Sequence, residues 1–446
     1  MWKVDHSALL TDSYHFSMVQ AYLEHGLTQP AVFELFTRRM PSGRNFLVAA
    51  GAEQVLEYLE NLRFSSEEIE YLRASGLYHD QTLSYLREFR FDGDVWALPE
   101  GTPFFINEPI LRIRASLPQA QLVETRVINL LQFQSLIASK AARSFLVAQN
   151  KFLVDFGLRR AHGSEAGLLA ARASFLAGFN GTSDVLAGMR FGIPVYGTMA
   201  HSFIEAHESE SAAFENFVLS NPANTTLLID TYDTELAAGK VTRLAAKLQQ
   251  KGIAIQGVRL DSGDLESHAR KVRRILDDGG LKHAKIFMSG DIDEFYIREL
   301  LSRRTPVDGF GVGTLLTTSE DVPFLNCAYK LEEFAGIARR KRSEGKATWP
   351  GTKQICRQVQ PDGTYMFDIL QLETEPLTGF PLLSQTMRQG KRLREPTALA
   401  GLRESCINNL NHLPASLRSI LNDRSYEVRI SEGIRSTADR LDRRSA

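Results

Sequence analysis

The feature that most constrains the fold is an alternation of short apolar runs with helical segments between about residues 150 and 315. A helix between two strands returns the chain to the same edge of a sheet, so this alternation predicts parallel strands with right-handed crossovers. Seven apolar runs spread over about 165 residues predict a closed or nearly closed α/β barrel, with a doubly wound sheet as the alternative. The runs are KFLVDF, FLAGFN, IPVYG, TLLID, IAIQGVRL, KIFMS and VDGFGVG.

The regions on either side of this alternation have a different character. Before about residue 120, strand-like segments such as PAVFELFTRRM surround short helical segments such as SSEEIEYLRAS, which indicates an α+β domain. A helical stretch follows over about 121–149. Near the C-terminus, NCAYKLEEFAG and TWPGTKQICRQV are predicted to form a hairpin around the charged, solvated loop RRKRSEGK.

We therefore expect three parts. They are an N-terminal α+β domain over 1–120, an α/β barrel over 121–325, and a C-terminal region over 326–446 that packs back on the N-terminal domain.

Composition excludes several classes of protein. The 52 basic and 53 acidic residues give a net charge of −1, which argues against general nucleic-acid binding. No apolar run approaches the roughly 18 residues of a membrane span, and the N-terminus lacks the apolar core of a signal peptide. Cys327, Cys356 and Cys406 show no paired spacing, so we predict neither a disulfide framework nor a zinc site. These features favour a cytoplasmic protein without a nucleic-acid or membrane partner.

Several crossover helices have recognisable ends. One is predicted to begin at Thr182 and to stop at Gly192, with Asp184 in its first turn acting on the helix dipole. Two others are predicted to have Ser262 and Asp291 as N-caps.

Polar and glycine residues gather directly after the predicted strands. Because the active site of a parallel α/β barrel lies at the carboxyl ends of its strands, we expect these residues to face one mouth. Arginines can bind phosphate oxygens, glycine turns at helix starts can donate N–H groups to anions, and aspartates suit sugar hydroxyls or a divalent cation. The set predicts a phosphorylated sugar with a charged leaving group as ligand. Its members are Phe156, Arg159, His201, Asp230, Asp233, Arg259, Asp261, Asp264, Gly290, Asp291, Gly311, Gly313 and Thr314.

His201 has three interpretations on its sequence context alone. It could be a structural histidine, a metal ligand together with Glu205 one helical turn away, or a nucleophile that accepts a phosphoryl group. The stretch GTMAHSFIEAHESE by itself leaves these open.

Nine motifs follow one another along the chain. They are TDSYHFSM, FELFTRRMP, DFGLRRAHG, GFNGTSDVLAG, GTMAHSF, LIDTYDT, VRLDSGDL, SGDIDEF and GVGT. Their order resembles that of the nicotinate phosphoribosyltransferase family, over about residues 11–315 and more loosely beyond. The resemblance implies a broken seven-stranded α/β barrel packed on an α+β domain, and a homodimer with shared active sites. It also implies transfer of phosphoribose from phosphoribosyl pyrophosphate to nicotinate, with Mg²⁺ required and ATP hydrolysis coupled.

The resemblance also implies residue roles. His201 would be phosphorylated by ATP and act in catalysis with Arg259 and Asp261. Nicotinate would be bound by Phe156, Arg159, Ser183 and the partner subunit's Tyr14, with the two aromatic rings on either side of the pyridine. The phosphoribosyl and phosphate groups would be bound by Arg259, Asp261, Gly290, Asp291, Gly311, Gly313 and Thr314.

Ser183 bears on the choice of substrate. The nicotinamide-using relative has an aspartate at this position, which accepts a hydrogen bond from a carboxamide, whereas a serine can donate to a carboxylate. The sequence therefore favours nicotinate.

Other functions remain as alternatives. They are a nicotinamide-using phosphoribosyltransferase, a non-catalytic ligand sensor on the same fold, and a metal-dependent barrel hydrolase built on His201 and Glu205. A type I phosphoribosyltransferase is disfavoured because its acidic DD…TGG-like loop is absent from the sequence. Retention of His201, Arg259 and Asp261 argues against the sensor.

Overall fold

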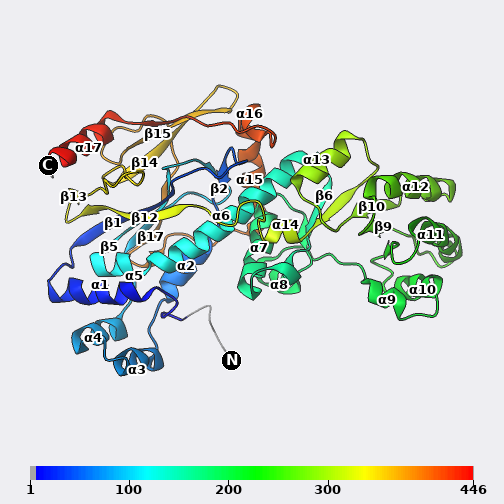
Figure 1. The fold of residues 1–446 in the computed structure, drawn as a ribbon, viewed down its shortest axis with the longest axis horizontal. Helices are drawn as coiled ribbons and strands as arrows, with labels where there is room; N and C mark the ends of the chain where they lie inside the picture. The colour runs from blue at the N-terminus through cyan, green and yellow to red at the C-terminus, as the bar shows by residue number, and fades with distance from the viewer. Residues whose placement is uncertain (1–6, 445–446) are drawn as a thin grey trace. The chain divides into compact units, whose positions relative to one another are not determined.

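The computed structural model describes residues 7–444 and divides into two units (Figure 1). The first unit contains the described residues up to Ser139 together with those from Val322 onward, and the second unit is Lys140–Asp321. Helix α6 (Glu124–Val147) runs from the first unit into the second. None of the helices in the described chain combines the length and hydropathy that a membrane span needs.

The first unit is built around antiparallel β-structure. Strand β1 pairs with both β5 and β12, and seven of its eight residues are buried, so side chains cover both of its faces. The main sheet has the order β13-β12-β1-β5-β3-β17-β18. Its strands are β1 (Pro30–Thr37), β3 (Asp94–Ala97), β5 (Pro109–Ser116), β12 (Cys327–Phe334), β13 (Ile337–Ala338), β17 (Ser384–Arg388) and β18 (Lys391–Arg392).

Two smaller sheets complete this unit. The four-stranded sheet has the order β16-β14-β15-β19, and β2 pairs with β4. These strands are β2 (Leu47–Val48), β4 (Pro103–Phe104), β14 (Lys353–Val359), β15 (Tyr365–Leu372), β16 (Phe380–Pro381) and β19 (Val428–Ile430). The unit's other helices are α1 (Ser13–Glu24), α2 (Ala52–Asn61), α3 (Ser66–Ala74), α4 (Asp80–Glu88), α5 (Leu117–Leu122), α15 (Leu399–His412), α16 (Ala415–Arg418) and α17 (Glu432–Arg444).

The predicted C-terminal hairpin is wrong. Strand β12 pairs with β1 and β13 in the main sheet, whereas β14 pairs with β15 and β16 in the four-stranded sheet. The distant strand β1 pairs with β12 at seven positions. Phe33 of β1 also stacks on Tyr329 of β12, with ring centroids 4.8 Å apart. The charged loop is largely exposed as expected, although Arg340 and Arg342 form ion pairs with Asp442.

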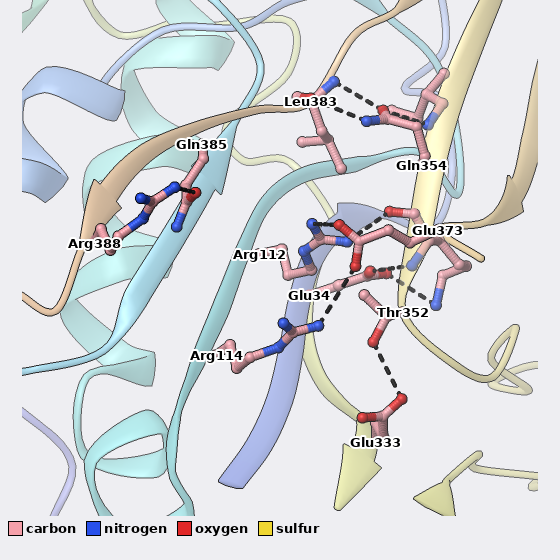
Figure 2. Close-up of polar contacts among 12 residues, drawn as sticks. Glu34, Arg112, Arg114, Glu333, Thr352, Gln354, Glu373, Leu383, Gln385 and Arg388 are labelled. Carbon is pink, nitrogen blue, oxygen red and sulfur yellow. Dashed lines mark hydrogen bonds and ion pairs between the residues drawn. The ribbon is translucent and has the colours of Figure 1, made fainter. Parts of the chain in front are cut away.

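Charged side chains join β14 and the end of β15 to the main sheet of this unit. Figure 2 shows Arg112 and Arg114 of β5 converging on Glu373, which Arg112 reaches at 2.8 Å. Glu34 of β1 accepts a hydrogen bond from the Lys353 backbone N–H, and the Lys353 ammonium lies 2.9 Å from Glu34 and 3.3 Å from Glu332. Burial, followed by repulsion from Glu34, raises the pKa of Glu332 to about 8.

The second unit contains a parallel sheet, as expected, of the order β7-β6-β11-β10-β9-β8. Its strands are β6 (Phe152–Asp155), β7 (Gly181–Thr182), β8 (Thr226–Leu228), β9 (Gly257–Leu260), β10 (Lys285–Met288) and β11 (Gly309–Val312). Its helical segments are η2 (Leu158–Arg160), α7 (Ser164–Leu176), α8 (Val185–Phe191), α9 (His201–Glu205), α10 (Glu210–Ser220), α11 (Thr234–Gln249), α12 (Leu265–Asp278), α13 (Glu294–Ser302) and α14 (Thr314–Thr317).

The predicted number of strands is wrong in two places. The run FLAGFN is the end of α7 and the turn after it, because a helix that is buried on most sides has the same continuous apolar pattern as a buried strand. The run IPVYG contributes only a single bridge, between Thr182 and Val195. Five of the seven predicted runs form strands, and the short strand β7 directly after FLAGFN makes the sixth. No pairing among the described residues closes the sheet from β8 to β7.

The predicted helix starts are displaced by two or three residues. The N-caps of α12 and α13 are Asp264 and Asp293 rather than Ser262 and Asp291. Helix α8 begins at Val185, with the Asp184 carboxylate accepting hydrogen bonds from two backbone N–H groups, and ends before Gly192 as predicted. In each case the loop between strand and helix is longer than the sequence pattern indicated.

We predict that Lys353→Met destabilises the protein by about 3–5 kcal/mol, because it leaves buried Glu34 and Glu332 without their shared cation. Urea unfolding at pH 7 measures the change. A loss below about 1 kcal/mol, the size of an ordinary substitution, would contradict this account.

Glu332→Gln is the matched control, because it leaves one buried carboxylate, that of Glu34, paired with the Lys353 ammonium. The folded-state pKa of Glu332 lies above its ordinary value, so its contribution to stability falls as pH rises from about 4.5 to about 8. The Gln variant should lack this fall and should exceed Lys353→Met in stability at pH 7.

Candidate active site

Functional side chains follow the strands of the second unit at the carboxyl edge of its sheet. Strands β8 and β9 are paired in parallel, as are β9 and β10, so the residues after them are neighbours. Asp230 follows β8, Asp261 follows β9 and Ser289 follows β10. This is the edge at which ligands bind in α/β folds.

Carboxylate and hydroxyl groups connect these strand ends. The Ser262 hydroxyl donates to Asp230 at 2.6 Å, and the Ser289 hydroxyl donates to Asp261. Asp230 also accepts a hydrogen bond from the Asp261 backbone N–H. Each serine thus donates to the aspartate of the preceding strand, which fixes both carboxylates.

His201 and Arg259 join the same network. His201 Nδ1 lies 3.1 Å from the Thr231 hydroxyl, and its Nε2 lies 3.9 Å from Asp261. Arg259 lies 3.9 Å from Asp261 and donates to the Thr198 hydroxyl at 2.7 Å. The structure therefore brings together the three residues expected to act in catalysis.

Arg259 is mostly buried yet incompletely paired. Its side chain is 15% exposed, and its Nε lies buried without a hydrogen-bond partner among the described residues. Burial lowers the pKa of Arg259, Asp261 and Asp230 oppose this, and the positive charge of Arg159 lowers it further. Arg159 is exposed in η2 and has no ion pair with a described residue. Two guanidinium groups within electrostatic range of each other are an arrangement suited to an anion.

An aromatic surface lies at the end of β6. A Cβ added to Gly311 would lie 2.4 Å from two carbons of the Phe156 ring, so this ring rests directly on the Gly311 backbone. The Phe156 N–H donates to the Val312 carbonyl at 2.8 Å, and the Ser183 N–H donates to the Asp155 carbonyl at 2.8 Å. Ser183 and Phe156 therefore follow two paired strands, β7 and β6.

The glycine turns expected to bind phosphate differ in their contacts with the His201–Asp261 network. Gly290 has a φ of +111°, and a Cβ there would lie 2.7 Å from the Asp261 carbonyl, so only glycine fits this approach to the network. Asp291 and Thr314 are exposed, and Gly313 lies immediately before α14. No described side-chain contact joins Asp291 or Thr314 to His201, Arg259 or Asp261, so their roles stay predictions.

Comparison with known proteins identifies the family of the chain. Residues 9–132 match the nicotinate phosphoribosyltransferase N-terminal domain, and residues 152–354 match the nicotinate phosphoribosyltransferase family. The chain belongs to the nicotinate phosphoribosyltransferase family. It is 46% identical to nicotinate phosphoribosyltransferase pncB2 of Mycobacterium tuberculosis, over 97% of this chain and 94% of that protein. It is 32% identical to nicotinate phosphoribosyltransferase of Bos taurus, over 98% of this chain and 97% of that protein.

Solved structures of the nicotinate phosphoribosyltransferase type are similar in fold. Human nicotinic acid phosphoribosyltransferase aligns with a TM-score of 0.87 at 29% identity, covering 97% of this chain and all of that one (100%). Nicotinate-nucleotide pyrophosphorylase from Pyrococcus furiosus aligns with a TM-score of 0.74 at 25% identity, covering 92% and 96%. These alignments include both units of the chain.

The sequence-based prediction missed several residues of this candidate site. Thr198, Thr231 and Ser289 share one signal, a hydroxyl within a strand-end loop. Asp155 could have been found as the acid between the apolar run FLV and Phe156. Asp233 and Asp264 accept backbone N–H groups as N-caps of α11 and α12, and their expected place near a ligand stays a prediction. The missed residues are Asp155, Thr198, Thr231 and Ser289.

Tyr14 belongs to the first unit. It lies on α1, is 47% exposed, and its ring centroid is 4.1 Å from that of His15. Burial, followed by the negative charges of Glu124 and Asp12, raises the pKa of Tyr14 to about 12, so it is a neutral aromatic ring at physiological pH. Its predicted role opposite Phe156 stays a prediction.

We predict that Gly311→Ala destabilises the second unit by about 1–3 kcal/mol, because the new methyl group must displace the Phe156 ring. Urea unfolding measures the change. Gly239→Ala is the control: its Cβ would lie 3.6 Å from its nearest neighbour on α11, so this variant should be neutral or more stable. Equal stability of the Gly311→Ala variant and the unmodified protein would contradict the ring position.

Proposed function

We propose that the protein is a nicotinate phosphoribosyltransferase of NAD biosynthesis, which forms nicotinate mononucleotide and pyrophosphate from nicotinate and phosphoribosyl pyrophosphate. The observation that carries this proposal is that His201 and the mostly buried Arg259 both approach Asp261. Strands β6 and β7 of the same sheet are followed by Phe156, whose ring rests on Gly311, and by Ser183. An aromatic acid and a sugar carrying phosphates match these two kinds of surface.

Arg259 and Asp261 have separate roles in this reaction. As the pyridine nitrogen bonds to the sugar carbon, the bond from that carbon to the pyrophosphate oxygen breaks and negative charge grows on the departing group. Arg259 stabilises this charge because its guanidinium is already desolvated and fixed by Thr198. Asp261, held by Ser289, accepts hydrogen bonds from ribose hydroxyls.

The decisive experiment is an assay of nicotinate mononucleotide formation with Mg²⁺, with and without ATP. Arg259→Ala should lower kcat/KM for phosphoribosyl pyrophosphate by about 10²-fold, the effect of removing one charge-stabilising group. Arg270→Ala, which removes an arginine paired with Glu266 on α12, should leave it unchanged. Ligand binding without any turnover would instead support the sensor.

Mg²⁺ fits the carboxylates of the network. Asp230 Oδ1 is buried without a hydrogen-bond partner in the described part of the chain, and Asp261 has an oxygen 3.9 Å from His201 Nε2. No group of three or more ligating side chains occurs among the described residues, which suits an ion held by one or two carboxylates and the substrate's own phosphates. Asp230 and Asp261 would hold Mg²⁺, which would neutralise pyrophosphate charge.

Ser183 is proposed to select nicotinate. We predict a preference for nicotinate over nicotinamide of at least about tenfold in kcat/KM, or about 1.4 kcal/mol, because a hydroxyl donates to a carboxylate. Ser183→Asp should move the preference toward nicotinamide, since an aspartate repels the carboxylate and accepts from the amide.

The control for added charge is Ser220→Asp, at the exposed end of α10. It should leave the preference as it is. Equal kcat/KM values for nicotinate and nicotinamide in the unmodified protein would support the nicotinamide alternative instead.

His201 is proposed to accept the γ-phosphoryl group of ATP, the co-substrate, on an imidazole nitrogen while ADP leaves. The ring is partly exposed and lies beside the Thr231 hydroxyl, and Arg259, which approaches the same Asp261 as His201, is the cation that would offset the added charge. We predict that His201→Asn abolishes ATP stimulation and leaves slow transfer without ATP.

Incubation with γ-labelled ATP tests this step. Phosphohistidine is stable in alkali and labile in acid, so the label should be lost in acid and absent from His201→Asn. His207→Asn is the control, because its ring bonds the Phe203 carbonyl and lies outside the network; it should keep the label. Acid-stable label, or equal label on His201→Asn, would rule out this role.

The remaining family features are proposals as well. We propose a cytoplasmic homodimer in which the partner subunit's Tyr14 faces Phe156, and in which the open six-stranded sheet and the 193–197 segment form the broken barrel. The division at 1–120, 121–325 and 326–446 belongs to the same proposal. Light scattering tests the assembly, and a monomer at assay concentrations would contradict shared sites.

A further inference from the structure

Asp155 is a buried acid to which the proposed reaction gives no role. It is the last residue of β6 and is 2% exposed. One carboxylate oxygen accepts the Gly157 N–H at 2.9 Å, and the other accepts the Thr182 hydroxyl at 2.8 Å. Its backbone carbonyl accepts the Ser183 N–H at 2.8 Å. A single residue therefore links the turn after Phe156 to the end of β7 and to Ser183.

The neighbouring groups allow this linkage little freedom. The Thr182 hydroxyl that donates to Asp155 also accepts the Asp184 N–H at 3.0 Å, which ties Asp155 to the cap of α8. A Cβ on Gly157 would lie 1.8 Å from the Thr317 hydroxyl oxygen and 3.1 Å from Asp155 Oδ1. The turn that carries Phe156 and Arg159 therefore packs closely against Thr317 of α14, and the Asp155 carboxylate binds its Gly157 N–H.

The carboxylate has no ion pair with any described lysine, arginine or histidine, and its contacts are neutral donors. Burial raises the pKa of Asp155 to about 6, against the hydrogen bonds from Gly157 and Thr182. An unpaired buried acid costs stability, and such groups concentrate at functional sites. An apolar residue of similar size would serve packing alone.

We propose that Asp155 is a positioning residue for the aromatic substrate. It fixes the Phe156–Arg159 turn relative to Ser183, so that the distance between the Phe156 ring and the Ser183 hydroxyl stays constant. This inference rests on the proposed nicotinate site. A carboxylate is required because two donors, the Gly157 N–H and the Thr182 hydroxyl, each need an acceptor. An asparagine offers one acceptor and turns its NH₂ group toward the other donor.

The test compares KM values for the two substrates. Asp155→Asn should raise KM for nicotinate by about tenfold, the effect of one lost hydrogen bond, and leave KM for phosphoribosyl pyrophosphate within about twofold. Thr182→Val, which keeps the side-chain shape and removes the donor, should raise KM for nicotinate by about threefold. If Asp155→Asn does not fold, the KM values of Thr182→Val test the proposal in its place.

Asp308→Asn is the matched control. Asp308 immediately precedes β11 at the amino end of the same sheet, and its carboxylate accepts the Ile286 N–H at 2.9 Å. It should leave both KM values unchanged. An unchanged KM for nicotinate in folded Asp155→Asn, or an equal rise in both KM values, would overturn the proposal.

Calorimetric titration with nicotinate separates this inference from the proposed function. If the unmodified protein binds nicotinate without turnover and Asp155→Asn binds about tenfold more weakly, the positioning role holds and the proposed function fails. If the unmodified protein turns over nicotinate and Asp155→Asn binds it equally well, the positioning role fails alone. Absence of any nicotinate binding overturns both.

Discussion

The desolvated guanidinium of Arg259 is the constraint around which the second unit's polar groups are arranged. A buried arginine needs nearby negative charge, and Asp261 and Asp230 supply it from adjacent strand ends. Those carboxylates are fixed in turn by Ser289 and Ser262, each one strand further along. The parallel registers of β8, β9 and β10 make this possible, because they bring equivalent positions to one edge. His201 completes the arrangement, with its Nδ1 beside the Thr231 hydroxyl and its Nε2 3.9 Å from Asp261.

The same edge carries two kinds of surface that differ in polarity. Around β8, β9 and β10 it is ionic and hydroxyl-rich, whereas at β6 and β11 it offers the Phe156 ring lying on Gly311. Such a division suits a bisubstrate reaction between a flat aromatic molecule and a polyanion. It also explains why glycine is needed where it is, since Gly311 gives the ring a flat surface and Gly290 brings its loop close to Asp261.

Much of this could be predicted from the sequence, and the failures have physical causes. Parallel strands and the loop residues His201, Arg259 and Asp261 followed from alternation and position. The strand assigned to FLAGFN failed because Phe175 and Leu176 end a helix that is buried on most sides, where helix and strand patterns coincide. The N-caps failed because Asp264 and Ser262 are equally good caps in isolation, and only the Asp230 carboxylate decides that Ser262 is engaged elsewhere. Asp155 could be recognised only as the acid that ends the apolar run FLV, because its partners, a backbone N–H and a hydroxyl from another strand, leave no pattern in the sequence.

The first unit is interrupted in the chain by the whole of the second unit. Glu34 meets the Lys353 backbone across 319 residues, and Arg112 meets it across 241. During synthesis, therefore, both side chains leave the ribosome long before their partners exist, and the second unit is complete before the first can close. Contacts so distant in sequence slow folding and leave unpaired strand edges exposed while the chain waits. The order of translation thus makes the first unit, although it begins the chain, the last part of the protein to acquire its native charge pairs.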